Sequence, residues 1–513
     1  MLVTCVNVWS PVFGLTRFLS VGREFEQRGT AAYRAAPKYV TPARWGFDGQ
    51  LYAEMALDPL LRDPQLKVAL DNPPYRGHRI LLPWLAWLGG LGRPARVLTA
   101  YAALNPVFWL GYVALLYAIF RGRGWAGVAG FAAMVLTCGV IASTFRALTD
   151  FPAFVLMTLA AVLGGGGGAA ALALAALTRE INLFGLAGIL EFEPPWDRAF
   201  WKNLRRGVLA AGPLALWWAY VHLRFPMPTS LAGRNFEWPF HAIFRKAVEV
   251  FAVIREGGID WPQFYKSTPL HALLTILATL TQCLYLVTHR EWRNRLWRIG
   301  IVFVPLFVCI GYQVWYSHFT VTRHALPITL AFNALLAARP NRRWLVWFLL
   351  GNCFVPYGIY KFVSFGLETP RPAEVRVVAA PQLEPTADTT VDASFGAGWS
   401  GSEESGAGGG RRADAGRATL VLANGGRQAL LTELSFVARA DVARDLRLSV
   451  KGTVVWEGPL APGPAPIPVR TAKFLLPPGE TVVAFDAGPA PTPPAFVLSC
   501  LAVGVAAAPP GSP

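Results

Sequence analysis

Two aspartates and two arginines lie close together between a short apolar start and the first long hydrophobic run. Asp48 stands in GFDGQLYAEM, and Asp71, Arg76 and Arg79 stand in LDNPPYRGHRI. A carboxylate can accept the proton of a hydroxyl group while the hydroxyl oxygen forms a new bond. Guanidinium groups bind phosphate through paired hydrogen bonds. These side chains together predict the transfer of a group, such as a sugar, from a phosphate to a hydroxyl.

Each of these four residues also has a simpler interpretation. Asp48 precedes a glycine, which is a common turn sequence, and Asp71 can close a turn ahead of two prolines. Arg76 and Arg79 can contact lipid phosphate at a membrane surface. The second acid and the arginines nearby favour Asp48 as the base. For Asp71, orienting the acceptor or sharing the role of the base is evenly balanced against the turn.

The composition predicts a membrane protein. The chain is 54% hydrophobic and only 15% charged, with 19 Trp and 32 Phe, and apolar runs near the length of a bilayer span recur from Val97 to Val363. The net charge of +16 lies mostly in short clusters between these runs, so we expect no nucleic-acid partner. The six cysteines show no spacing typical of a disulfide framework or a metal site.

The basic clusters predict a topology. They occupy 121–123, 198–206, 289–298 and 339–343, and the positive-inside rule places them in the cytoplasm. Spans are predicted at about 97–120, 124–143, 151–168, 207–223, 270–288, 298–316, 322–338 and 343–363, with a hairpin of two shorter segments over 169–193. A helix over Ile80–Leu91 is predicted to lie in the interface, with a short span as the alternative. The first 18 residues are polar for a full span and lack signal-peptide features, so we expect the chain to begin within its first transmembrane helix.

The residues that could act chemically all fall on the opposite, outer side. They are the segment Asp48–Arg79, Asp150, Arg179, Glu180, His318, Arg323 and His324. Charges near a membrane interior are costly and are usually functional or paired. Their convergence on one face therefore predicts a site there.

The charged residues after the first loop have separate predicted roles. Arg179 and Glu180 interrupt an apolar stretch, and because burial of such a pair adds little stability, we predict that they bind substrate. Arg323 is predicted to be a second phosphate ligand, with His318 and His324 beside it. No acids stand at ligand spacing from these histidines, so a divalent metal is the less favoured alternative and no cofactor is expected.

Asp150 is predicted to be structural rather than functional. It follows Arg146 by four positions, a spacing that suits an ion pair within a helix. We therefore expect these two side chains to pair.

The character of the sequence changes near residue 367. Residues 367–417 are rich in Pro, Gly, Ala and Asp and are predicted to be a linker. Residues 418–513 contain short alternating runs punctuated by Gly, Pro and Asn, which predicts a β-sandwich-like domain on the outer side. The predicted fold is thus an all-α polytopic membrane bundle of about ten to twelve transmembrane helices over 1–366, with a large first outer loop at about 21–79, followed by a C-terminal β-sandwich domain.

The first 363 residues resemble a known family. The resemblance rests on GFDGQLY from Gly46, YRGHRILLP from Tyr75 and LTRE from Leu177, and it is to bacterial members of the GT-C superfamily of glycosyltransferases. The resemblance implies a multi-span bundle with a large first outer loop and interfacial helices, a lipid-phosphate-linked sugar donor, and a catalytic acid that corresponds to Asp48. It does not extend to the C-terminal domain.

The leading hypothesis is an inverting, mannosyltransferase-like hexosyltransferase in the bacterial inner membrane. It would move a sugar from a polyprenyl-phosphate donor to an envelope lipid, glycan or protein. A transporter or flippase for a lipid-linked glycan would show internal repeats, which the chain lacks. A non-catalytic envelope scaffold whose outer domain binds glycan is the third hypothesis. The sequence names neither the sugar, the acceptor, the lipid length nor the oligomeric state.

Overall fold

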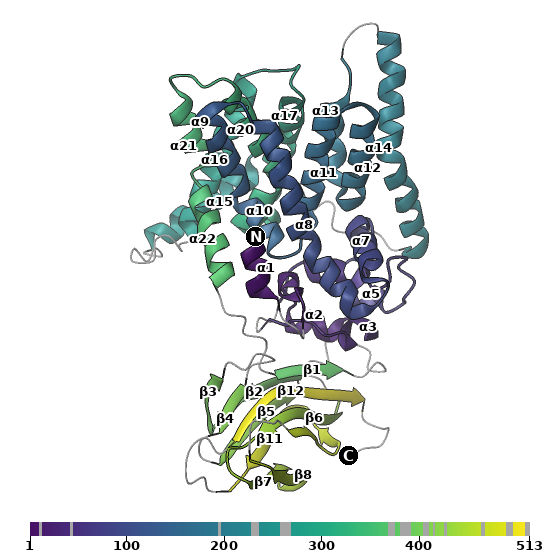
Figure 1. The fold of residues 1–513 in the computed structure, drawn as a ribbon, viewed down its shortest axis with the longest axis vertical. Coiled ribbons are helices and arrows are strands. Elements are labelled where there is room, and N and C mark those ends of the chain that lie inside the picture. The colour runs from purple at the N-terminus through teal and green to yellow at the C-terminus, as the bar shows by residue number, and fades with distance from the viewer. Residues whose placement is uncertain are drawn as a thin grey trace.

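The computed structural model divides into a helical part, which ends at Leu367, and a part built of strands, which begins at Val375 (Figure 1). This confirms the prediction of a mostly helical N-terminal region followed by C-terminal β structure. The structure describes residues 1–9, 13–41, 45–192, 196–226, 235–256, 268–367, 375–379, 391–403, 410–413, 416–424, 428–462, 467–488 and 496–507.

Short helices occupy the first ninety residues, including the predicted first loop, and long helices with short ones between them follow. The short elements are α1 (Leu2–Val8), η1 (Thr16–Leu19), α2 (Arg23–Arg28), α3 (Ala31–Ala35), α4 (Gly49–Met55), α5 (Leu66–Ala69), α6 (Pro73–Gly77) and α7 (Leu81–Gly90). The next are α8 (Pro94–Phe120), α9 (Gly124–Val135), α10 (Cys138–Thr144), α11 (Asp150–Leu163), α12 (Gly165–Thr178), η2 (Glu180–Gly185), α13 (Leu186–Ile189) and α14 (Trp196–Arg224). The last are α15 (His241–Arg255), α16 (Thr268–Thr288), α17 (Arg295–Val308), α18 (Tyr312–Trp315), α19 (His318–His324), α20 (Leu326–Ala338), α21 (Trp344–Gly351) and α22 (Val355–Leu367).

Three helices of the described ranges are long and apolar enough to cross a bilayer. They are Pro94–Phe120, Gly124–Thr144 and Pro269–Thr288, and a fourth is added if Trp344–Gly351 and Val355–Phe365, bent by 48°, count as one span. Shorter apolar helices of 10–17 residues accompany them, such as Leu326–Ala338. These helices support the prediction of a membrane protein, and the total of ten to twelve spans stays a prediction.

Helix α8 illustrates how the sequence builds a span. Pro94 stands in its first turn, where its fixed φ suits a helix and its missing N–H is not needed. At about 1.5 Å per residue, the 27 residues of α8 exceed the thickness of the hydrocarbon core. Helix α7 packs closely on α8, because a Cβ at Gly90 would lie only 2.4 Å from the nitrogen of Val97.

The helices near the glycine run Gly164–Gly168 differ in their bounds from the predicted spans. The predicted span over 151–168 is α11, which ends at Leu163, and the chain turns at Gly164 with φ of 62°. Most of the glycine run then belongs to α12, which begins at Gly165 and ends at Thr178. The physical reason is that glycine tolerates both the left-handed turn and the helix, so packing against α11 and α14 decides where the turn ends.

The four basic clusters gather at the end of the helical part that lies away from the strands (Figure 1). Arg123 donates to the carbonyl of Ala334. Arg339 pairs with Glu291 at 3.2 Å. The predicted clusters therefore share one end of the molecule, as a topology with all four in the cytoplasm requires.

Two sheets form the C-terminal part. Their strands are β1 (Val375–Ala379), β2 (Val391–Phe395), β3 (Trp399–Glu403), β4 (Gly410–Ala413), β5 (Arg417–Asn424), β6 (Leu430–Arg439), β7 (Arg444–Val450), β8 (Thr453–Leu460), β9 (Ile467–Arg470), β10 (Phe474–Leu476), β11 (Gly479–Asp486) and β12 (Phe496–Ala507). One sheet has the order β10-β6-β12-β4-β3, with β1 on β12 and β9 on β6, and the other has the order β2-β5-β11-β7-β8. All described pairs are antiparallel except β1 with β12. Buried and less buried residues alternate along β5, as expected for a strand with one face on a core.

Strands β1 to β4 lie inside the range 367–417, which was predicted to be a linker. Strands β3 (WSGSE) and β4 (GRRA) carry weak strand signals because Gly, Ser and charged residues are frequent in them, whereas the valines of β1 (VRVVA) are typical of a strand. Strands β1 and β4 pair with β12, and β2 pairs with β5, so these pairings with later strands are not visible locally. Strand β3 pairs with its neighbour β4. The exact domain boundaries stay a prediction.

Candidate active site

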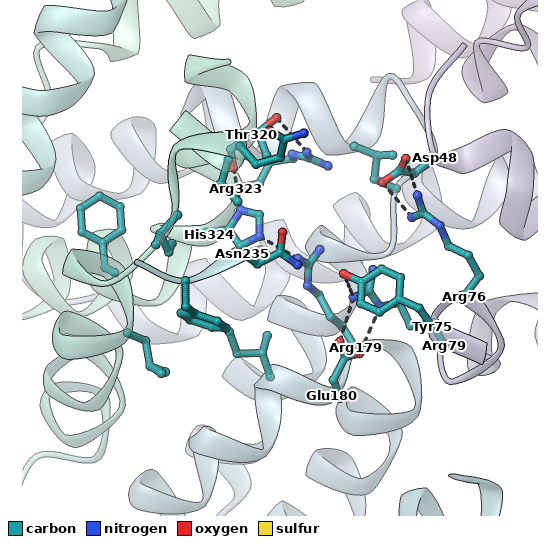
Figure 2. Close-up of a pocket in the computed structure, with 18 of the residues that line it drawn as sticks. Asp48, Tyr75, Arg76, Arg79, Arg179, Glu180, Asn235, Thr320, Arg323 and His324 are labelled. Carbon is teal, nitrogen blue, oxygen red and sulfur yellow. Dashed lines mark hydrogen bonds and ion pairs between the residues drawn. The ribbon is translucent and has the colours of Figure 1, made fainter. Parts of the chain in front are cut away.

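One cavity brings together residues from three distant parts of the helical region (Figure 2). Its volume is about 620 Å³. Every predicted site residue whose side chain the structure describes lines it: Asp48, Asp71, Arg76, Arg79, Arg179, Glu180, Arg323 and His324. His318 begins α19, and its side chain lies outside the described residues.

Asp48 occupies the position before the first turn of α4. The next residue, Gly49, packs directly on the chain between α10 and α11, because a Cβ there would lie 2.1 Å from the carbonyl oxygen of Arg146. The guanidinium of Arg146 also lies 3.7 Å from the centre of the Phe47 ring. The α10–α11 connection therefore supports the backbone that presents Asp48.

Arg76 joins both aspartates of the first loop. Its Nη1 lies 3.0 Å from Oδ2 of Asp48, and its Nη2 donates to Oδ1 of Asp48 at 3.1 Å. Its Nε and Nη2 donate to Asp71 at 2.8 and 2.7 Å. Asn72 begins α6 by accepting the amide of Tyr75 with its side chain, so the Asp71 turn and the Arg76 helix form one local unit.

The electrostatic environment keeps Asp48 ionised. Burial in the site would raise the pKa of Asp48, but the charge and hydrogen bonds of Arg76, with smaller contributions from Arg323 and Arg79, bring this pKa below its ordinary value. The Asp48 side chain still retains 48% of its exposure, whereas Arg76 retains 9%. The charged carboxylate of Asp48 thus faces the cavity, while the guanidinium of Arg76 that binds it is largely buried.

Tyr52 connects Arg76 to the second arginine of the loop. The tyrosine is almost fully buried, and its hydroxyl accepts hydrogen bonds from Nη1 of Arg76 at 3.2 Å and from Nη1 of Arg79 at 2.8 Å. Arg79 also donates to both oxygens of Glu180 at 3.1 and 2.8 Å and to the hydroxyl of Tyr75 at 2.6 Å. The Arg79 side chain is 4% exposed, so protein partners already take most of its donors.

Asp150 lies behind the far side of the cavity and binds two arginines. Arg179 donates to its Oδ1, and Arg323 donates to its Oδ2 at 3.1 Å. The expected pair with Arg146 is therefore wrong: the Asp150 carboxylate binds charges brought by other helices, and Arg146 contacts Phe47.

His324 fixes the orientation of Arg179. Nη2 of Arg179 lies 2.7 Å from Nε2 of His324, and Nδ1 of the same ring lies 2.7 Å from the carbonyl oxygen of Thr320. Since a guanidinium only donates, Nε2 accepts and Nδ1 carries the hydrogen. His324 is thus a neutral support for Arg179 in this arrangement.

An apolar surface faces the charged half of the cavity. It comes from α17, the chain that follows it, and η2: Ile181, Phe303, Leu306, Phe307, Ile310 and Val314. A cavity with one charged and one apolar half suits a ligand that carries both a phosphate and a hydrocarbon.

Sequence reasoning missed several polar residues of the site. Tyr52 follows Asp48 by one helical turn, a spacing that could have indicated a shared face. Tyr75, Asn235 and Thr320 also line the cavity, but no local pattern distinguishes them. Within the described ranges, no group of three or more His, Cys, Asp and Glu side chains is placed to hold a metal ion.

No protein-family model and no curated protein matches the chain. Among solved structures, it is similar over 66% of its length to ArnT from Cupriavidus metallidurans in the apo state, with 13% identity, 74% of that chain covered and a TM-score of 0.28. It is also similar, over 25% of its length, to the GH26-CBM35 β-(1,4)-mannanase of Podospora anserina, with 15% identity and a TM-score of 0.17. This second match spans only 27% of the mannanase chain. Both TM-scores are below 0.5, so neither likeness carries an argument about function.

Proposed function

We propose that this protein is an integral-membrane glycosyltransferase that moves a sugar from a polyprenyl-phosphate donor to a hydroxyl group of an envelope lipid, glycan or protein. The observation that carries the proposal is the Asp48 carboxylate. It is half-exposed to a cavity, ionised by a buried Arg76, and faces further arginines and an apolar wall. These are the groups that deprotonation of an alcohol and departure of a lipid phosphate require.

In the proposed reaction, Asp48 accepts the proton of the acceptor hydroxyl while the hydroxyl oxygen bonds to the anomeric carbon. The bond between that carbon and the phosphate oxygen breaks, and the electron pair leaves with the polyprenyl phosphate. A single displacement of this kind inverts the anomeric centre. Asp71 acts through Arg76, whose Nε and Nη2 it holds, and so keeps Asp48 in position.

The arginines differ in how well they could bind the donor phosphate. Arg323 uses Nη1 for Asp150 and Nη2 for Thr320, which leaves further N–H groups of its guanidinium for a ligand. Arg179 and Arg323 are 13% and 12% exposed, against 4% for Arg79. We therefore assign phosphate binding first to Arg323 and Arg179, with Arg76 and Arg79 holding the base side of the site and Glu180 anchoring Arg79.

The proposed setting is the bacterial inner membrane, with the cavity and the C-terminal sheets on the outer side. This orientation is supported by the four basic clusters at the opposite end of the helical part. The proposed fold is a GT-C-like bundle of about ten to twelve spans, in which the shorter apolar helices complete the bilayer region. The proposed reaction requires the lipid-linked donor and no cofactor.

The proposal is tested by sugar transfer with purified full-length protein in lipid and a panel of polyprenyl-phosphate sugars, including mannose. We expect Asp48→Asn to abolish transfer, because it removes the proton acceptor and keeps the side-chain shape. Asp441→Asn, the same change at an exposed position in the strand region, should transfer at the rate of the wild type. Equal transfer by wild type and Asp48→Asn would exclude Asp48 as the base, and a product with retained configuration would exclude the direct displacement.

A further inference from the structure

Helix α15 has two opposite faces, and one of them is an exposed apolar stripe. Its buried residues, Ala242, Ile243, Lys246 and Val250, face the rest of the helical part, where α15 contacts α16 and α18. On the other side, Phe244, Val248 and Phe251 are 70%, 51% and 60% exposed. Positions i, i+4 and i+7 share one face of a helix, so these three residues form a continuous stripe, called here the α15 stripe.

The stripe continues an apolar surface that belongs to a candidate span. Helix α16, on which α15 packs, contains the apolar stretch Pro269–Thr288, and its own Leu277, Leu284 and Val287 are between 44% and 54% exposed. If α16 crosses the bilayer, these side chains contact acyl chains, and the surface next to them borders the same lipid.

Basic residues of α15 are placed where they could contact the headgroups of anionic lipids. Arg245 and Arg255 are exposed near the edges and the end of the stripe, and basic residues beside an apolar helix face attract anionic headgroups. Trp238, which precedes the helix, is 85% exposed, and Trp is enriched at membrane interfaces.

We propose that α15 lies in the interface of a phospholipid bilayer, with the α15 stripe among the upper acyl chains of the leaflet on the cavity side. The inference rests on the membrane location of the helical part, which belongs to the proposed function, and not on the chemistry of Asp48.

The segment before α15 connects this lipid contact to the wall of the cavity. Gly311 donates its amide to the carbonyl of Asn235 at 2.7 Å, and Glu237 donates its amide to the carbonyl of Cys309 at 2.9 Å. The Glu237 side chain also accepts the amide of Tyr312 at 2.8 Å. Asn235, Phe236 and Ile310 line the cavity. The position of α15 in the lipid therefore determines the position of this wall of the cavity.

The turn from this wall into the helix is tightly defined. Phe240 has a φ of 64°, a left-handed conformation that residues with a side chain rarely adopt. Its amide donates to the carbonyl of Val308 at 2.7 Å. The start of α15 is therefore fixed to the end of α17, and a displacement of α15 would move the wall.

Lipid contact is tested in full-length protein that carries a fluorescent amino acid at Val248, in nanodiscs of phosphatidylcholine and phosphatidylglycerol. Val482 in β11, which is 48% exposed, is the matched control position. We expect brominated acyl chains to quench the probe at Val248 several-fold and to leave the probe at Val482 unchanged. Equal emission from Val248 in brominated and ordinary lipid would overturn the proposal, because the stripe would then face water or a protein partner.

The connection to the cavity is tested by hydrogen exchange in the same nanodiscs. The double variant Phe244→Ser/Phe251→Ser changes only exposed side chains and should fold. We expect faster exchange of the Gly311 and Tyr312 amides than in the wild type, with Val482→Ser causing no change there. Unchanged exchange at both amides would overturn the connection. Neither experiment measures sugar transfer, so failure here is distinct from failure of the proposed reaction.

Discussion

Asp48 and Asp71 bind the same guanidinium from two sides: Nη1 of Arg76 lies 3.0 Å from Asp48 and its Nε lies 2.8 Å from Asp71. Arg76 therefore couples the two carboxylates, and both of them line the cavity. Under the proposed function, Asp48 is the base and Asp71 acts through Arg76.

The first prediction concerns the pH dependence of transfer. In the wild type, the pKa of Asp48 is below its ordinary value because Arg76 outweighs the effect of burial. Replacing Arg76 by Gln removes this charge, so burial should raise the pKa of Asp48 above that in the wild type. Because only the ionised carboxylate accepts a proton, we expect the acid limb of the profile of kcat/KM against pH to move upward.

The exposed Arg62 provides the control for this change. Arg62→Gln removes a charge from the same loop without touching Asp48 and should leave the acid limb in place. An acid limb that does not move in Arg76→Gln would show that Arg76 does not set the ionisation of Asp48.

The second prediction is that the Tyr52 hydroxyl positions Arg76 and Arg79. Tyr52→Phe leaves one N–H of each arginine unpaired in a buried site, and each such loss costs about 1–3 kcal/mol. We expect kcat/KM to fall roughly tenfold or more, with a larger change in kcat than in KM. A purely structural role would lower thermal stability without this split.

Tyr101→Phe is a matched control for the tyrosine. Tyr101 is also fully buried, and its hydroxyl has no hydrogen-bond partner among the described residues. We expect its removal to leave transfer near the wild-type rate. Similar kinetics for both variants would contradict the role assigned to Tyr52.

The third prediction concerns stability and pH. Glu54 lies on α4 with Asp48 and accepts the amide of Thr30, and burial raises its pKa to about 7. Between the ordinary carboxyl pKa and about 7, the folded protein keeps a proton that the unfolded chain releases, so the free energy of unfolding falls as pH rises through this window. The loss is on the order of 3 kcal/mol.

Glu54→Gln keeps an oxygen for the Thr30 amide and carries no titrating proton. We expect this variant to gain thermal stability relative to the wild type at pH 8 and much less at pH 5. Glu457→Gln, in the strand region, should show the same difference from the wild type at both pH values. An equal effect of Glu54→Gln at the two pH values would refute the raised pKa.

The fourth prediction concerns the close contact behind Asp48. A Cβ at Gly49 would lie 2.1 Å from the carbonyl oxygen of Arg146 and 3.0 Å from that of Ala147. Since neither is the flexible end of a side chain, Gly49→Ala must displace α4, at a cost of about 1–3 kcal/mol. We expect both thermal stability and transfer to fall, because Asp48 moves with the helix.

Gly212→Ala is the control for this substitution. Gly212 lies inside α14, and apart from its chain neighbours and the adjacent backbone of that helix, no described atom would lie within 4 Å of a Cβ added there. Alanine favours a helix over glycine by roughly 0.5–1 kcal/mol, so we expect unchanged or slightly higher stability and full transfer. Full transfer by Gly49→Ala would show that the packing behind Asp48 does not position it.

Local sequence was sufficient to predict some elements of the fold and insufficient for others. The span at 97–120 agrees with α8 to within a few residues, because a long apolar run between a proline and a basic cluster has one local interpretation. Helix α11 ends at Leu163, before the predicted end of its span at 168, and the strands at 375–413 lie in a range predicted to be a linker. Glycine-rich stretches suit several conformations, and contacts with distant segments select one of them. Helix α15 was not predicted, although its alternating apolar and charged residues stand in the sequence.

The sequence by itself determined the chemistry that is available: an acid in the first loop, arginines that can bind phosphate, long apolar helices, and basic clusters that share one end of the molecule. Only the tertiary structure decided the partners. Arg79 binds Glu180 across 101 positions and Arg179 binds His324 across 145, while Asp150 binds Arg179 and Arg323 rather than Arg146. The physical reason is that local pattern encodes whether a residue is buried, whereas the choice of ion partner depends on which helices pack together, and that choice is made by contacts between distant segments.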